Sequence, residues 1–170
     1  MNILLNWGAK NTGAKYRVKG ADLESARKFL SGREEWGLFV GDFSYKWKGD
    51  AQSNVSLVRI EPKFTITMPS WPAYRNQPQQ CKDEWDTMWR ALGKHEDGHR
   101  DLFERGISQL LSKLEALEAA TGREVDDFME QARAEIQSEH DAYDTRTDYG
   151  KSRGVELSIT EQCRSKPKGD

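Results

Sequence analysis

The chain has 170 residues, which is long enough for one domain with its own hydrophobic core. Its 26 Lys and Arg residues are balanced by 28 Asp and Glu residues, which argues against a broad nucleic-acid-binding surface. No apolar run approaches the length of a membrane span. We therefore expect a single domain over residues 1–163 and a disordered tail at 164–170, with no nucleic-acid partner and no membrane span.

The first seven residues and the two cysteines bear on the compartment. Residues 1–7 lack the basic region and the long apolar stretch of a secretory signal peptide. The default expectation is therefore a cytoplasmic protein, and the alternative is a periplasmic or secreted one whose leader was removed or that leaves by a leaderless route. Cys81 and Cys163 lie far apart in the sequence, and they either pair in an oxidising compartment or remain two thiols.

The first half of the chain predicts short strands and one helix. Polar and apolar residues alternate, as in half-buried strands, in four segments: 15–19, 42–47, 55–60 and 64–68. Asp22 is a suitable N-cap for a short helix that Gly32 ends. Pro62 marks a break or an edge between the last two strands.

The second half changes to a helical period. Apolar residues recur every three or four positions from Asp83 to Leu117, which predicts one long amphipathic helix. Thr121-Gly122 ends it, and a second helix carries its apolar stripe from Val125 to Tyr143. Residues 155–159 are a candidate last edge strand.

The sequence His95-Glu96-Asp97-Gly98-His99 is an H-E-x-x-H motif on the long helix. Residues four apart lie on one helix face, so the two imidazoles can share a tetrahedral zinc ion. Glu96 is then close enough to take a proton from a zinc-bound water. The apolar stripe of the helix has a gap that His95 and His99 fill, which predicts that both side chains turn inward.

The alternative interpretation of the motif is a pair of core histidines that bond to local acceptors. Gly98 is a second unusual feature, because glycine weakens a helix by about 1 kcal/mol relative to alanine. Close packing of a strand or a substrate against the helix would explain a glycine at this position, and the alternative is a tolerated defect.

A catalytic zinc ion usually has three protein ligands and a water. If the two long helices form an antiparallel hairpin around residues 121–122, His140 lies opposite about residue 102, and the segment 144–149 lies beside the motif histidines. This hairpin leaves four candidates for the third ligand: His140, Asp144, Asp148 and Tyr149.

Four features occur together in chain order: an N-terminal β region, the segment Thr67-Met68-Pro69-Ser70-Trp71, a Trp-rich lead into His95-Glu96-Asp97-Gly98-His99-Arg100, and the block Tyr143-Asp144-Thr145-Arg146-Thr147-Asp148-Tyr149-Gly150. In this combination the chain resembles a bacterial family of small zinc-dependent proteases that was first catalogued as a domain of unknown function. The resemblance runs from about Tyr16 to Val155.

The resemblance implies zinc ligands at His95 and His99 and a catalytic Glu96. The family's downstream block usually reads Y-D-x-x-T-x-H-G, and its histidine would be the third ligand. The matching residue here is Tyr149, whose oxygen can also bind zinc, so Tyr149 is favoured and His140 is the alternative. A water or an acidic residue in that position, or a weakened site, also stays open.

Three further residues match the downstream block: Tyr143, Asp144 and Thr147. In one interpretation they support the ligands, for example by Asp144 accepting a hydrogen bond from an imidazole N–H. In the other they form a helix end, where Tyr143 packs while Asp144 and Thr147 bond to local backbone groups.

Together these features predict an α+β, zincin-like fold, in which an antiparallel β region with a short helix precedes two long antiparallel helices that carry the site. The expected function is that of a zinc metallopeptidase, a hydrolase in which Glu96 is the general base and a peptide or protein is the substrate. Residues 64–68 are the candidate edge strand for binding that peptide. Two alternatives remain, namely a catalytically weak or inactive metal-binding interaction module and a toxin- or effector-type hydrolase.

Overall fold

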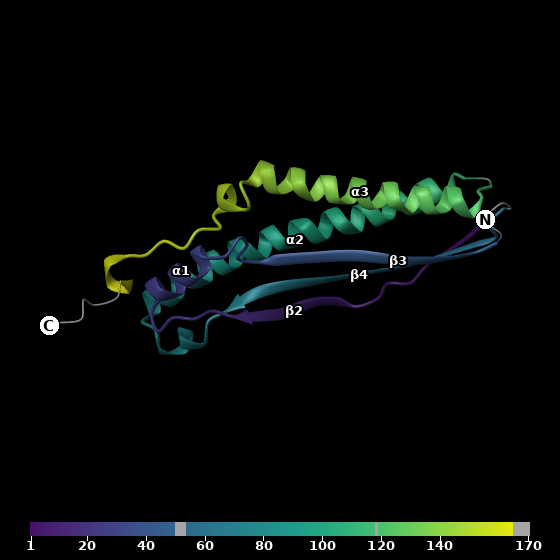
Figure 1. The fold of residues 1–170 in the computed structure, drawn as a ribbon. Coiled ribbons are helices and arrows are strands. Elements are labelled where there is room, and N and C mark those ends of the chain that lie inside the picture. Colours follow the sequence, from purple (N-terminus) through teal and green to yellow (C-terminus); the bar gives the residue numbers. More distant parts are fainter. Residues whose placement is uncertain (50–53, 118, 165–170) are drawn as a thin grey trace. The chain divides into compact units, whose positions relative to one another are not determined.

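The computed structural model describes residues 1–49, 54–117 and 119–164 (Figure 1). The chain divides into two compact units. Unit 1 comprises residues 1–11, 39–65 and 98–143, and unit 2 comprises residues 12–38, 66–97 and 144–170. The prediction of one domain over 1–163 stays a prediction. The predicted tail lies, apart from Arg164, outside the described residues.

The secondary structure confirms the α+β class. The strands are β1 (Asn2–Leu5), β2 (Lys10–Arg17), β3 (Leu38–Lys48) and β4 (Leu57–Ser70). The helices are α1 (Leu23–Ser31), α2 (Gln79–Glu115) and α3 (Gly122–Thr147), with short 3₁₀ turns at Pro72–Asn76, Lys151–Arg153 and Glu161–Cys163. No helix among the described residues is long and apolar enough to cross a membrane. The zincin-like arrangement stays a prediction.

Strand β4 pairs with each of the other three strands. Strand β1 runs parallel to it, with Ile3 opposite Val58, so the expected antiparallel arrangement is wrong for this pair. A parallel pair needs a long crossover connection, and the chain between β1 and β4 provides one.

The two strands predicted at 55–60 and 64–68 form one continuous strand, β4. Pro62 does not break it, and its carbonyl accepts the backbone N–H of Gly8 at 2.8 Å. Strand β4 has β1, β2 and β3 as its neighbours. The prediction that residues 64–68 bind an added peptide strand stays a prediction.

Helix α1 forms where its sequence signals predict it. The side chain of Asp22 accepts the backbone N–H of Ser25 at 2.8 Å, which satisfies one of the free donors at the helix start. Gly32 is the C-cap. The inward face of α1 is buried along Leu23, Ala26 and Leu30.

In unit 1, the second part of α2 packs antiparallel to α3 (Figure 1). A Cβ on Gly106 would lie 2.5 Å from Ile136, so the two helices approach closely there. Lys113 and Glu135 form an ion pair at 2.7 Å toward the far end of the pair. The buried apolar side chains of this layer include Phe103, Ile107, Leu110, Leu114, Val125 and Met129.

In unit 2, the chain after α3 forms no strand at 155–159, so that prediction is wrong. The segment instead packs through the buried side chains of Val155 and Leu157. It ends at a disulfide between Cys163 and Cys81 of α2, whose Cα atoms are 5.6 Å apart. Side-chain packing and the disulfide therefore hold the segment, which makes no ladder of backbone hydrogen bonds.

Candidate metal centre

The H-E-x-x-H residues lie in the middle of α2 and turn inward, as the gap in the apolar stripe predicts. His95, Glu96 and His99 are only 5%, 4% and 7% exposed. Buried polar groups require partners, since an unpaired one costs several kcal/mol, roughly 2–7. The long amphipathic helix therefore places two imidazoles and a carboxylate in its core-facing stripe, where apolar side chains would otherwise lie.

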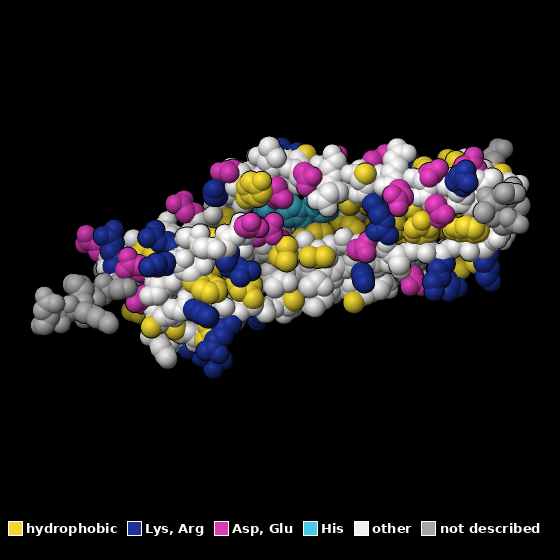
Figure 2. All heavy atoms as spheres, in the orientation of Figure 1, with side chains coloured by type: hydrophobic (Ala, Val, Ile, Leu, Met, Phe, Trp, Pro, Cys, Tyr) yellow, Lys and Arg dark blue, Asp and Glu magenta, His cyan; other side chains and the backbone are white. Residues whose placement is uncertain are grey.

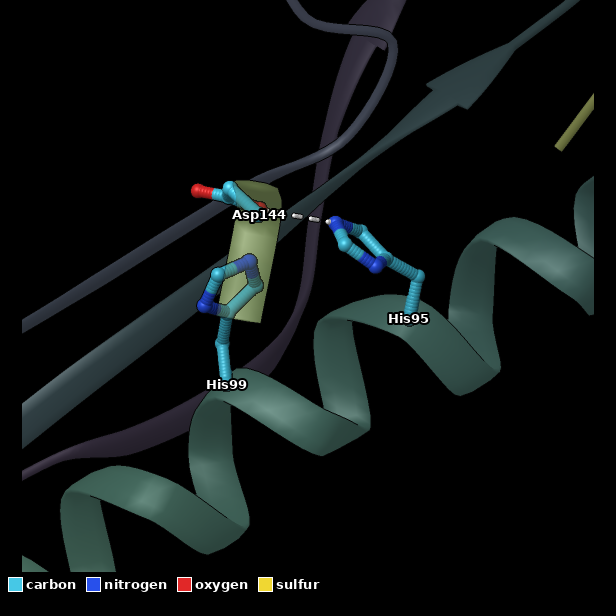
Figure 3. Close-up of side chains that lie close together, drawn as sticks. All are labelled: His95, His99 and Asp144. Atoms are coloured by element: carbon cyan, nitrogen blue, oxygen red, sulfur yellow. Dashed lines mark ion pairs between the residues drawn. The ribbon is translucent and has the colours of Figure 1, made fainter. Parts of the chain in front are cut away.

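Asp144, in the last turn of α3, lies beside His95 in unit 2. Its Oδ1 atom is 3.3 Å from Nε2 of His95, and its side chain is 21% exposed. Figure 3 shows His95 and His99 projecting from successive turns of α2 toward Asp144. This position agrees with the prediction that the segment after Tyr143 lies beside the motif.

One nitrogen from each histidine and one oxygen from Asp144 lie within 4.8 Å of one another. Ligands bound 2.0–2.1 Å from a tetrahedral zinc ion are about 3.4 Å apart, close to the separation of His95 and Asp144. Two imidazoles and a carboxylate are also a donor set that catalytic zinc sites use. The cluster could therefore hold a metal ion.

The two histidines of the cluster are buried, and the side chain of Asp144 is partly exposed to solvent. Figure 2 shows histidine side chains, in cyan, at the surface beside acidic side chains. Burial lowers the pKa of His99 to about 4, so this imidazole is neutral at pH 7. A neutral imidazole has the free lone pair that a metal ion needs.

His99 is enclosed by aromatic rings within unit 1. Its ring stacks on Phe39 and on His140, at centroid distances of 6.1 Å and 5.0 Å. The edge of the Tyr143 ring meets it at 4.8 Å. Nδ1 of His99 lies 2.8 Å from Nδ1 of His140, a hydrogen-bond distance. These contacts fix the orientation of the His99 ring.

Glu96 packs against the chain that enters β3. A Cβ on Gly37 would lie 2.4 Å from Oε1 of Glu96, so a larger residue at position 37 would displace this carboxylate from its present position. Neither Gly37 nor Phe39 is among the site residues predicted from the sequence. The sequence signal that could have pointed to a close approach here is a glycine directly before the apolar residues 38–40.

The end of α3 makes a left-handed turn. Asp148 and Tyr149 have φ values of 46° and 52°, and Gly150 has φ 84°. A Cβ on Gly150 would lie 3.1 Å from Cγ of His95, so this glycine also lets the turn approach the motif. The Tyr149 side chain is 59% exposed. The assignment of Tyr149 as third ligand stays a prediction.

Thr147 bonds to groups of the turn that follows α3, and its predicted support of the ligands stays a prediction. Its hydroxyl accepts the backbone N–H of Gly150 at 3.3 Å, and its carbonyl accepts the hydroxyl of Ser152 at 2.9 Å. Thr147 therefore helps to hold the turn that carries Gly150.

Gly98 is explained by Tyr143. A Cβ at position 98 would lie 2.1 Å from the Tyr143 hydroxyl oxygen, so a tyrosine from α3 occupies the space that we assigned to a strand or substrate. Gly93, in the same helix, would meet only Met68, at an ordinary 3.7 Å. The two glycines thus form a matched pair.

We expect Gly98→Ala to destabilise the protein and Gly93→Ala to stabilise it. Both changes gain up to about 1 kcal/mol of helix propensity. At position 98 the overlap with the buried Tyr143 costs about 1–3 kcal/mol and outweighs that gain. Urea unfolding of the two variants measures the difference. Equal stabilisation by both would contradict the packing of Tyr143 on Gly98.

A scan against family models matched residues 14–150 to the family described as "Bacterial protein of unknown function (DUF922)". The chain belongs to this family. The matched DUF922 segment contains the motif on α2 and the whole of α3, and it ends at Gly150 beside His95. Searches of curated proteins and of solved structures returned no match.

Proposed function

We propose that this protein is a zinc-dependent peptidase. The observation that carries the proposal is the buried group of His95, Glu96 and His99 on one helix, with Asp144 within 4.8 Å of both histidines. Metal-binding residues with a neighbouring carboxylate make up the catalytic set of the H-E-x-x-H class. A purely structural pair of core histidines would not need Asp144 and Glu96 beside it.

In this proposal His95, His99 and Asp144 hold the zinc ion. Zinc bound there would supply a Lewis acid and a water of lowered pKa. We favour Asp144 over Tyr149 as the third ligand, because Oδ1 of Asp144 already lies 3.3 Å from His95, whereas Tyr149 is 59% exposed.

Glu96 would act as general base and then as general acid. Its carboxylate accepts one proton from water as the water oxygen bonds to the peptide carbonyl carbon. When the C–N bond breaks, Glu96 returns that proton to the departing amine nitrogen. Packing against Gly37 limits the positions that the carboxylate can take, which favours a fixed proton-transfer geometry.

Metal analysis combined with a peptide-hydrolysis assay tests the proposal. Purified protein dialysed against zinc should retain one equivalent of metal, and it should cleave a denatured protein substrate. His95→Ala, His99→Ala and Asp144→Ala should each lose the metal, while Tyr149→Phe should keep it. A wild-type protein without stoichiometric zinc would contradict the proposal. Retention by Asp144→Ala with loss by Tyr149→Phe would make Tyr149 the third ligand.

A second candidate is a binding module that keeps zinc for structure. The observation in its favour is Tyr149, which replaces the histidine of the family block and is largely exposed. Thermal melts of the His99→Ala variant distinguish the two candidates. A structural site loses metal and much of its stability together, whereas a catalytic site loses activity with a smaller change in melting temperature.

A further inference from the structure

Each motif histidine of α2 has a ring nitrogen within 3.3 Å of a side-chain atom of α3. His99 meets His140 within unit 1, and His95 meets Asp144 within unit 2. His140 and Asp144 are themselves four residues apart, and so lie one above the other on one face of α3. The pair four residues apart on α2 is therefore matched by a pair four residues apart on α3.

The distance between the two histidines argues against a shared metal ion. Nδ1 of His99 and Nδ1 of His140 are 2.8 Å apart. Two ligands of one tetrahedral zinc ion are about 3.4 Å apart, so this shorter separation is that of a hydrogen bond. Among the described residues, the cluster with ligand atoms close enough to hold an ion consists of His95, His99 and Asp144. His140 is not part of it.

The hydrogen bond decides which His99 atom can bind metal. A neutral imidazole carries one N–H, and a metal takes the nitrogen without it. If His99 donates from Nδ1–H to Nδ1 of His140, its Nε2 lone pair is free for the metal. His140 then accepts at Nδ1 and carries its own proton on Nε2.

We propose that His140 is a positioning residue that holds His99 in the tautomer with its proton on Nδ1. This role rests on the proposed zinc site. His140 is well placed for it, because its ring is half-buried and stacks on Phe39 at 5.3 Å as well as on His99. Hydrogen bonds of this kind orient a metal-binding imidazole and raise its basicity.

Two substitutions of His140 distinguish the effect of its hydrogen-bond acceptor from the effect of its ring stacking. His140→Asn keeps an oxygen acceptor near the position of Nδ1 but loses the ring stack. His140→Phe keeps the stack but loses the acceptor. Ser138→Ala, an exposed position on the same helix, is the control. The probes are Zn²⁺ affinity by competition with a chelator, the visible spectrum of the Co²⁺-substituted protein, and the imidazole NMR signals of the zinc-loaded protein.

We expect His140→Phe to weaken zinc binding by about 10- to 100-fold, and His140→Asn by less than about tenfold. The Co²⁺ spectrum should stay that of the wild type in both, because the ligands are unchanged. The downfield Nδ1–H signal of His99 should persist in His140→Asn and be lost in His140→Phe.

Two results would overturn the role of His140. Wild-type affinity in His140→Phe would show that the hydrogen bond does not position His99. Equal loss of metal in both variants, with a changed Co²⁺ spectrum, would make His140 a ligand. If the wild-type protein bound no zinc, the proposed function itself would fail, and the role of His140 with it. Thermal melts of the metal-free variants separate these outcomes from misfolding.

Discussion

Glu96→Gln is expected to lower peptide hydrolysis by roughly 100- to 10,000-fold, the range for loss of a general base. Glutamine has nearly the shape of glutamate but cannot accept the proton of the attacking water. Glu96 is not among the clustered metal-binding atoms, so the variant should still retain one equivalent of zinc. Initial rates with a peptide substrate, measured beside metal content, test this expectation.

Asp101→Asn is the matched control for Glu96→Gln. It also removes one negative charge from α2, but its side chain is exposed and pairs with Arg100. Its hydrolysis rate should stay within about twofold of the wild type, since exposed ion pairs contribute little. Unchanged hydrolysis in Glu96→Gln would reject the general-base role. Loss of both zinc and activity would instead indicate that Glu96 holds the metal centre together.

Loss of the Cys81–Cys163 disulfide should cause the largest change in stability. The two cysteines are 82 residues apart. Closing a loop of that length lowers the entropy of the unfolded chain, which stabilises the folded state by about 4–5 kcal/mol at 25 °C. The double variant Cys81→Ala/Cys163→Ala should therefore melt roughly 10–15 °C below the oxidised protein. Differential scanning calorimetry with and without reductant measures this shift.

Reduced wild-type protein is the internal control for the double variant, and its melting temperature should fall by a similar amount. An unchanged melting temperature in both would show that the disulfide does not contribute to stability. Because disulfides persist where thiols are oxidised, we propose that this protein works in an oxidising compartment. A fully reduced pair of cysteines in protein isolated from its native cells would contradict that placement.

Local helix physics made much of the site predictable. Residues four apart share a face in any α-helix, so His95 and His99 could be paired and turned inward without knowledge of their neighbours. The gap in the apolar stripe gave their direction, and their burial agrees with it. The Asp22 cap and the Gly32 end of α1 were predictable for the same reason, because each depends on a few adjacent residues.

Long-range pairing was predicted less well, because it depends on where loops place the elements. The expected hairpin centre at 121–122 put His140 opposite about residue 102, yet it bonds to His99. Helix α2 ends at Glu115 and α3 begins at Gly122, so the turn is centred earlier in the chain. That shift is about one helical turn, and it brings Asp144 to His95.

Strand alternation likewise gave the buried face of a strand but not its neighbours. The parallel pairing of β1 with β4 and the central place of β4 came from packing of distant segments. The pairing of Cys81 with Cys163 likewise depends on the packing of distant segments. The same is true of the position of Asp144 beside the two motif histidines. Spacing along a helix is a local property that a sequence shows directly. The contacts that complete this site join residues dozens of positions apart, and only the packing of the whole chain selects them.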